Sequence, residues 1–250
     1  MTEGSLEQSI ADTREGVMTS DEIQIGEGSE LVEHWEQEHG PSQIFSAEDI
    51  ANSVSHGVGL GMSIAGLAVL LVVAWLHGET AHIVSAAVYG STLVLLFAAS
   101  TLYHSMTRPG LRRLFRIIDH SAIYLLIAGS YTPFTLVTLS GAWGWTLFAI
   151  VWSLALIGVL YKIFWFGRFM SLSIGLYLVM GWTMVVAIRP LLEALDITGV
   201  ILVFVGGVFY TGGVAFFAWN KLVFNHAIWH LCVLAAAVCH YLAILFYVMM

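Results

Sequence analysis

The sequence predicts an all-α membrane protein, a seven-transmembrane helix bundle, and two observations support this prediction. The chain of 250 residues is 58% hydrophobic and only 10% charged, with a mean hydropathy of +0.84. A soluble domain carries roughly a quarter charged residues. Beyond residue 50, moreover, the apolar residues fall into runs of about 20, the length that a helix needs to cross ~30 Å of hydrocarbon.

The N-terminal segment differs in composition from the rest of the chain. Of the 17 acidic residues, 13 lie in residues 1–49, together with only one basic residue, Arg14. So polar a segment does not bury enough apolar surface to offset its ordering entropy. We therefore expect residues 1–46 to be a disordered cytosolic tail, with at most one short helix over Ser29–Gly40, and residues 47–250 to form the membrane domain. The acidic total argues against a nucleic-acid partner, although it averages two unlike regions.

Seven apolar runs follow the tail, joined by short connections rich in polar, Gly or Pro residues. We expect the spans at Ser53–Leu76, Ile83–Tyr103, Ile117–Leu139, Trp143–Tyr161, Phe169–Ile188, Gly199–Trp219 and Ile228–Met250. Trp and Tyr lie near many of their ends, as in an interfacial aromatic belt. Within the third span, Pro133 in GSYTPF predicts a kink.

Lysine and arginine indicate which ends of the spans face the cytosol. The connections after the second, fourth and sixth spans hold seven basic residues, Arg108, Arg112, Arg113, Arg116, Lys162, Arg168 and Lys221. The opposite side holds only Arg189. By the positive-inside rule, the N-terminus is cytosolic and the C-terminus extracytosolic, in a multi-pass protein of the plasma (cytoplasmic) membrane.

Polar residues gather at one membrane level, the predicted cytosolic ends of four spans. They are Glu48, Asn52 and His56 before and within the first span, Ser100 and His104 in the second, Asp119 and His120 in the third, and His226 and His230 at the seventh. Polar groups inside a membrane are costly, and they usually mark function or paired structure.

Two of these histidines have the spacing of helical metal ligands. His226 and His230 lie i, i+4, so both rings project from one helix face and can reach one ion at ~2.0–2.1 Å. His104 is the obvious third ligand. Three histidines and an open fourth position are typical of catalytic zinc, with water as the fourth ligand. Asp119 would then accept a hydrogen bond from that water or act as its base.

Simpler interpretations remain open for the same residues. A lone His-x3-His pair is often surface decoration or a source of hydrogen bonds between membrane helices. Asp119 could instead pair with Arg116, three residues earlier. His240 lies about 15 Å beyond His230 by helical rise, so we expect it to be a packed, hydrogen-bonded side chain rather than a ligand.

Four stretches together resemble the hemolysin III family, which belongs with the progestin and adipoQ receptors and is more remotely similar to the alkaline ceramidases. They are EDIANSVSHGVG (Glu48–Gly59), STLYHS (Ser100–Ser105), IIDHSAIYLLIAGSYTPF (Ile117–Phe134) and HAIWHLCVLAAAVCHY (His226–Tyr241). The resemblance covers about residues 45–250. It implies a seven-helix bundle with zinc ligands His104, His226 and His230, with Ser100 and Asp119 at the site. Glu48, Asn52 and His56 match the family's N-terminal element, to which we assign a supporting role.

Three functions are compatible with these features. The first is a zinc-dependent hydrolase of a lipid amide or ester, in which Ser100 helps to hold the oxyanion and membrane lipids supply the substrate. The second is a non-enzymatic, receptor-like or lipid-sensing bundle with structural zinc. The third is a cytolytic protein, which the family name suggests, although no stripe of polar residues runs the full depth of the spans.

The basic bias makes the orientation testable. A topology reporter fused after Met250 is expected to be active only outside the cytosol, because seven basic residues flank one side of the predicted spans and one flanks the other. Signal from a reporter that works only in the cytosol would show the opposite orientation, with the polar residues at the outer face.

Overall fold

The computed structural model describes residues 46–168 and 170–250, and it confirms the all-α, seven-span architecture. Seven helical segments in this part of the chain are long and apolar enough to cross a membrane. The predicted tail, residues 1–46, and the short helix at Ser29–Gly40 lie outside the described residues, except for Ser46.

The spans follow one another with short connections, as predicted. In chain order they are α3 (Ala47–His77), α4 (Thr80–Ser105), α5 (Pro109–Pro133) continued by a π-helical turn (Phe134–Thr138), α6 (Gly141–Phe164), α7 (Met170–Trp182) continued by a 3₁₀ turn (Thr183–Ala187) and α8 (Ile188–Ala194), α9 (Ile197–Ala218) and α10 (Asn225–Tyr247).

Two helices begin well before the apolar runs that predict them. Helix α3 starts at Ala47 rather than Ser53, because the Ser46 hydroxyl accepts a hydrogen bond from the Asp49 backbone N–H at 2.9 Å and caps the first turn. Helix α5 starts at Pro109 rather than Ile117, with proline in the first turn, where its missing N–H costs nothing. The arginine-bearing segment, which the sequence predicts as a connection, is therefore mostly helical.

Helix α5 changes its helical form at Pro133, the residue at which the sequence predicts a kink. Pro133 is buried, and α5 changes from α-helical to π-helical geometry directly after it. Proline removes a backbone donor and crowds the preceding turn, which favours such a local change of helical form. The span nevertheless continues to Thr138, so GSYTPF lies within a helix and not in a binding loop.

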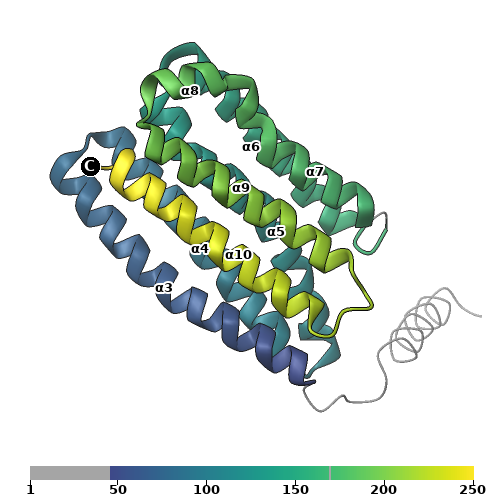
Figure 1. Cartoon of the computed structure of the whole chain (residues 1–250). Helices are drawn as coiled ribbons and strands as arrows, with labels where there is room; N and C mark the ends of the chain where they lie inside the picture. Colours follow the sequence, from purple (N-terminus) through teal and green to yellow (C-terminus); the bar gives the residue numbers. More distant parts are fainter. Residues whose placement is uncertain (1–45, 169) are drawn as a thin grey trace, which may run out of the picture. The chain divides into compact units, whose positions relative to one another are not determined.

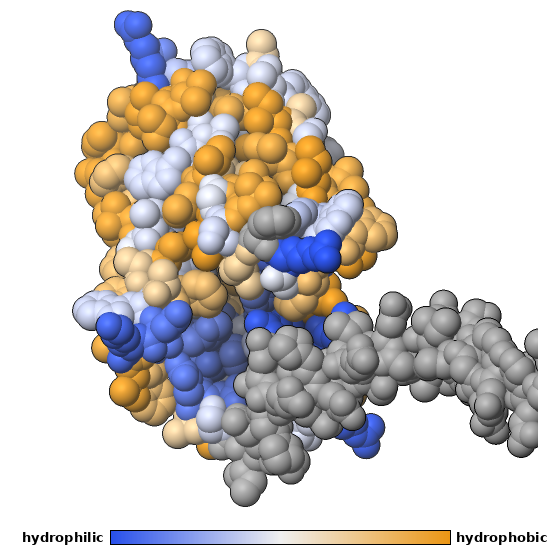
Figure 2. All heavy atoms as spheres, turned by 90° about the vertical axis from the view of Figure 1, so that its right-hand side faces the viewer, coloured by the Kyte–Doolittle hydropathy of each residue, from blue (hydrophilic) through white to orange (hydrophobic). Residues whose placement is uncertain are grey.

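The bundle is built mainly from helices adjacent in the chain and closes between its first and last spans. Helices α3, α4, α5 and α6 pack in succession, while α10 packs against both α9 and α3 (Figure 1). Figure 2 shows hydrophobic residues over much of the surface visible in that view. On α9, for example, Ile201, Phe204 and Val208 are exposed. Such side chains need no protein cover where lipid tails surround them.

A stripe of glycines lets α9 approach α10 closely. Gly199, Gly206 and Gly213 are spaced seven residues apart and are all buried. A side chain at these positions would meet, respectively, Tyr247, His240 and Trp229 of α10. Small residues commonly mark close helix contacts in membranes. The stripe thus fixes the position of the helix that carries His226 and His230.

Two neighbouring glycines of α9 allow a matched test of this packing. A Cβ at Gly213 would lie 2.7 Å from Trp229 Cε3 and 2.9 Å from Cys232 Cβ, whereas one at exposed Gly212 meets nothing within 4 Å. Gly213→Ala is expected to lower the free energy of unfolding in detergent by about 1–3 kcal/mol, the usual cost of overpacking. Gly212→Ala is expected to leave it unchanged or slightly higher. Equal effects of the two substitutions would contradict the close approach of α9 and α10.

Candidate metal centre

The three histidines predicted as ligands lie together in the structure. His104 comes from the last turn of α4, and His226 and His230 from the first turns of α10. Each offers a ring nitrogen, and these three atoms lie within 4.8 Å of one another. Two ligand atoms that each bind one tetrahedral ion at ~2.0–2.1 Å lie about 3.4 Å apart, which is within this upper limit. The three histidines could therefore hold a metal ion after small side-chain shifts.

The start of α10 places its two histidines at the level of His104. Phe224, directly before the helix, has φ +59°, a left-handed conformation that is rare and strained for a bulky residue. The next residue, Asn225, donates from its side chain to the Phe217 carbonyl of α9 at 3.2 Å. This tight return from α9 lets His226 begin the last span at the end of the bundle where α4 finishes.

Asp49 of α3 orients His104. Its Oδ1 lies 3.2 Å from His104 Nδ1 and accepts a hydrogen bond from Arg112 of α5 at 2.7 Å. Because a carboxylate accepts, Nδ1 carries the proton and the lone pair lies on Nε2. His104 Nε2 is buried and has no hydrogen-bond partner among residues 46–168 and 170–250. A histidine that donates its second N–H to a carboxylate is the usual arrangement of a metal ligand.

His230 is oriented in the same way by the backbone of α3. Its Nδ1 lies 3.4 Å from the Asn52 carbonyl, which again leaves Nε2 as the free nitrogen. The His56 ring stacks on the His230 ring, with centroids 3.6 Å apart and planes 12° apart. Phe97 contacts the same His56 ring edge-on at 5.0 Å. Asn52 thus contacts the site through its carbonyl and His56 through its ring face.

Glu48 ties the first span to the last. Its Oε1 accepts a hydrogen bond from the His226 backbone N–H at 3.2 Å. The first N–H groups of a helix have no partner within the helix, and a carboxylate there also suits the helix dipole. Glu48 therefore stabilises the turn that carries His226 through the backbone of that residue.

Ser100 and Asp119 are both buried near this cluster. Ser100 precedes His104 by one turn of α4, and its hydroxyl has no hydrogen-bond partner within the described part of the chain. Asp119 of α5 lines a cavity that His226 and His230 also line. The alternative ion pair between Asp119 and Arg116 is not formed in residues 46–168 and 170–250. The Arg116 guanidinium lies instead over the Phe166 ring, 5.5 Å from its centroid.

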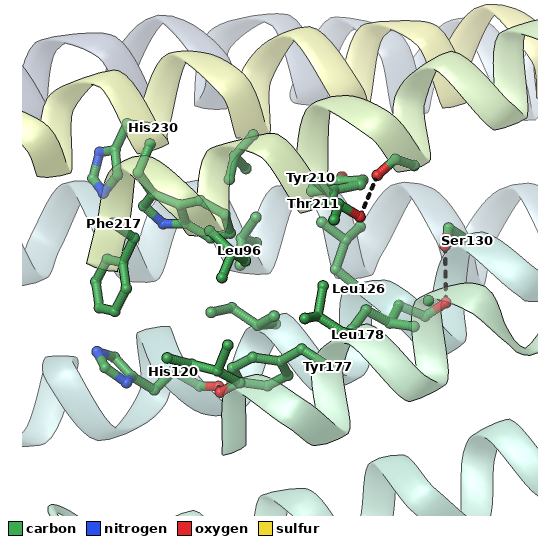
Figure 3. A pocket seen from close by; sticks show the side chains of 18 of the residues that line it. Leu96, His120, Leu126, Ser130, Tyr177, Leu178, Tyr210, Thr211, Phe217 and His230 are labelled. Carbon is green, nitrogen blue, oxygen red and sulfur yellow. Dashed lines mark hydrogen bonds between the residues drawn. The ribbon is translucent and has the colours of Figure 1, made fainter. Parts of the chain in front are cut away.

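The cavity extends from the histidines into the apolar interior of the bundle, between α5, α7, α9 and α10 (Figure 3). The centre of a water molecule can move over about 130 Å³ of it. Its middle is lined by apolar side chains, among them Leu96, Ile123, Leu126, Ile174, Leu178 and Val233. His240 lines the far part of the cavity and is hydrogen-bonded to the Val203 carbonyl at 3.1 Å, as expected of a packed histidine.

Sequence reasoning missed Asp49 and Arg112 as parts of the site. Asp49 enters the sequence analysis only in the count of acidic residues over positions 1–49, because the first apolar run begins only at Ser53. The pattern Ser46-x-x-Asp49 resembles a helix cap, and reading it so would have extended the helix and placed Asp49 on one face with Asn52 and His56. Arg112 contributed only to the count of basic residues that set the orientation.

Comparisons with known proteins agree with this architecture. A model of the family described as haemolysin-III related matches residues 46–241. The chain is 49% identical to "Hemolysin-3" of Bacillus cereus over 205 residues, which cover 82% of this chain and 94% of that protein. It is 47% identical to the "Hemolysin-3 homolog" of Bacillus subtilis (strain 168), over 80% and 94% of the two chains. It is also 30% identical to the human "Monocyte to macrophage differentiation factor", over 79% and 83%.

The contact between Asp49 and His104 predicts an effect on metal affinity. If the three histidines hold a metal ion, Asp49→Asn is expected to weaken its binding by ~10–100-fold in competition with a chelator, because the amide orients His104 less firmly and removes the negative charge. Glu193→Gln, which removes an exposed carboxylate 3.7 Å from Arg189, is the control and is expected to change nothing. Wild-type affinity in Asp49→Asn would show that Asp49 does not support a ligand.

Proposed function

The chain belongs to the haemolysin-III-related family of multi-pass membrane proteins, and we propose that it is a zinc-dependent hydrolase of a lipid amide or ester. The observation that carries the proposal is the cavity that joins the histidine cluster to the apolar interior of the bundle. The basic bias supports a location of the site near the cytosolic face of the plasma (cytoplasmic) membrane. Substrates would then come from the surrounding membrane lipids.

The residues fit zinc. Imidazole nitrogen suits this metal, and His104 Nε2 is a buried acceptor that lacks a donor in the described part of the chain. No fourth histidine, cysteine or carboxylate joins the group of three among the described residues. Three protein ligands and an open position are typical of catalytic zinc, whereas structural sites usually have four.

The shape of the cavity favours a lipid with one long chain. Its histidine end is lined by Asp119, His120, His226 and His230, and its middle by leucine, isoleucine and valine side chains. A reactive carbonyl would lie at the histidines, with the hydrocarbon chain along the apolar wall. The apolar middle does not favour a water-filled pore, although two relatives carry haemolysin in their names.

Zinc, when bound, polarises a carbonyl and lowers the pKa of water toward ~7. The side chains around it then have separate roles. Asp119, buried beside the cluster, takes the proton of the attacking water and returns it to the leaving amine or alcohol. Ser100, buried one turn before His104 on α4, would turn its hydroxyl toward the carbonyl oxygen as negative charge develops there. Asp49 and the Asn52 carbonyl keep His104 and His230 in the tautomer that leaves Nε2 free.

The Asp119→Asn variant distinguishes two hypotheses, a hydrolase and a lipid sensor with structural zinc. The amide retains the side-chain volume but cannot accept a proton, so hydrolysis of a lipid amide or ester is expected to fall by ~10²–10⁴-fold. Zinc content is expected to stay near wild type, because the three histidines remain. Turnover of a lipid panel, zinc content and melting temperature are measured on the same preparation.

Asp196→Asn is the matched control for this test. Asp196 caps α9 by accepting from the Thr198 N–H at 2.7 Å, and asparagine caps helices equally well. It is expected to retain full turnover. Wild-type protein that holds zinc but cleaves nothing in a broad amide and ester panel would contradict the hydrolase and favour the receptor-like or lipid-sensing alternative.

A further inference from the structure

The cavity is polar at both ends. Along α10 its lining runs from His226 to His240, fourteen residues or about 21 Å by helical rise. Figure 3 shows His230 and His120 toward one end, Ser130, Tyr210 and Thr211 toward the other, and Leu96 between. The histidine end belongs to the proposed metal site, whereas the proposed chemistry uses none of the polar groups at the deep end.

His240 lines the deep end of the cavity and has a buried ring acceptor without a donor. Its Nε2 lies 3.1 Å from the Val203 carbonyl, and because a carbonyl only accepts, Nε2 carries the proton. Nδ1 is then the acceptor, and this buried atom has no hydrogen-bond partner among residues 46–168 and 170–250. The ring is fixed by its neighbours, since any side chain at Gly206 would collide with it and Tyr210 contacts it at 5.5 Å between centroids.

Three hydroxyls that line the deep part of the cavity are committed elsewhere, whereas the Tyr210 hydroxyl forms no hydrogen bond within residues 46–168 and 170–250. Thr211 donates to the Gly207 carbonyl and accepts from the Trp182 indole at 3.0 Å. Ser130 donates to the Ile127 carbonyl. Tyr131 donates to carbonyls at the end of α7 and accepts from the Met184 N–H. The bonds of Tyr131 and Trp182 hold the point where α7 continues into its 3₁₀ turn. The hydroxyl hydrogens of Thr211, Ser130 and Tyr131 are therefore not available to His240.

From these contacts we propose that the deep end of the cavity is a subsite for a hydroxyl group on the hydrocarbon chain of the lipid, with His240 Nδ1 as its acceptor. The inference rests on the proposed function only for the class of ligand and for placing its carbonyl end at the histidine cluster. His240 follows His230 by ten residues, so the hydroxyl lies about 15 Å from the cluster. A ketone offers only acceptors and does not satisfy Nδ1.

Binding of a positional series tests the subsite without any turnover. The probes are fatty acids of one chain length, the acid product of amide or ester hydrolysis, each with a single hydroxyl at a successive carbon. They compete with a fluorescent fatty acid for the full-length, zinc-loaded protein in nanodiscs. One position, or two adjacent ones, is expected to bind about 3- to 10-fold more tightly than the unsubstituted acid, the gain that one net hydrogen bond supplies. The ketone at that position is expected to show no gain.

Substitutions at His240 assign the gain to this side chain. His240→Phe is expected to abolish the preference for the hydroxyl while binding the unsubstituted acid within about 2-fold of wild type. His240→Gln, which retains a donor and an acceptor, is expected to keep part of the preference for the hydroxyl probe. If His240→Phe does not fold, the subsite is tested by comparing the affinities of the hydroxyl and ketone probes for the wild-type protein.

The other outcomes overturn the proposal. Equal binding along the whole series means that water satisfies His240 Nδ1. Equal binding of hydroxyl and ketone means that the deep end does not select a donor, and failure of every probe to compete means that the cavity does not hold such a chain. A protein that shows the positional preference but hydrolyses nothing would contradict the proposed function and leave the subsite standing.

Discussion

The structure depends on one constraint, which is that polar groups buried in a membrane domain must find partners within the protein. The first span supplies several of these partners. Asp49 bonds to His104 of α4 and Arg112 of α5, the Asn52 carbonyl contacts His230 of α10, and Glu48 accepts from the first turn of α10. These contacts join the first span to the second, third and seventh, and they leave one nitrogen of His104 and one of His230 free for a common ligand. The polar end of α3 therefore orients the site without contributing a member of the histidine cluster.

The sequence predicted the seven spans and the meeting of His104, His226 and His230, because a run of apolar residues and an i, i+4 pair each have a direct structural consequence. It did not place the starts of α3 and α5. Those turns, at Ala47 and Pro109, are polar and are helical through a serine cap and an N-terminal proline, which hydropathy does not detect. Asp49 was missed for the same reason. Tautomers and ring stacking, such as His56 on His230, depend on packing between distant spans and could not be read from spacing.

The last two spans connect the histidine cluster to the rest of the cavity. Glycines of α9 allow the close contact that sets the position of α10, and one of them, Gly206, makes room for His240. The same helix thus presents His226 and His230 at one end of the cavity and His240 toward the other. This helix fixes the distance between the histidine cluster and His240, so a ligand chain that reached both would need a particular length. On the proposed function and the proposed subsite, reactivity would lie at the histidine cluster and selectivity at the deep end of the same cavity.

X-ray absorption at the zinc edge of the purified, zinc-loaded protein tests the central claim most directly, because it reports the atoms bound to the metal. One zinc per chain is expected, with nitrogen or oxygen ligands at ~2.0–2.1 Å, the outer-shell scattering of three imidazoles and a fourth, light-atom ligand. A sulfur shell at ~2.3 Å would contradict it, because the claimed ligand set contains no cysteine. So would a spectrum with fewer than three imidazoles, or a protein that retains no zinc.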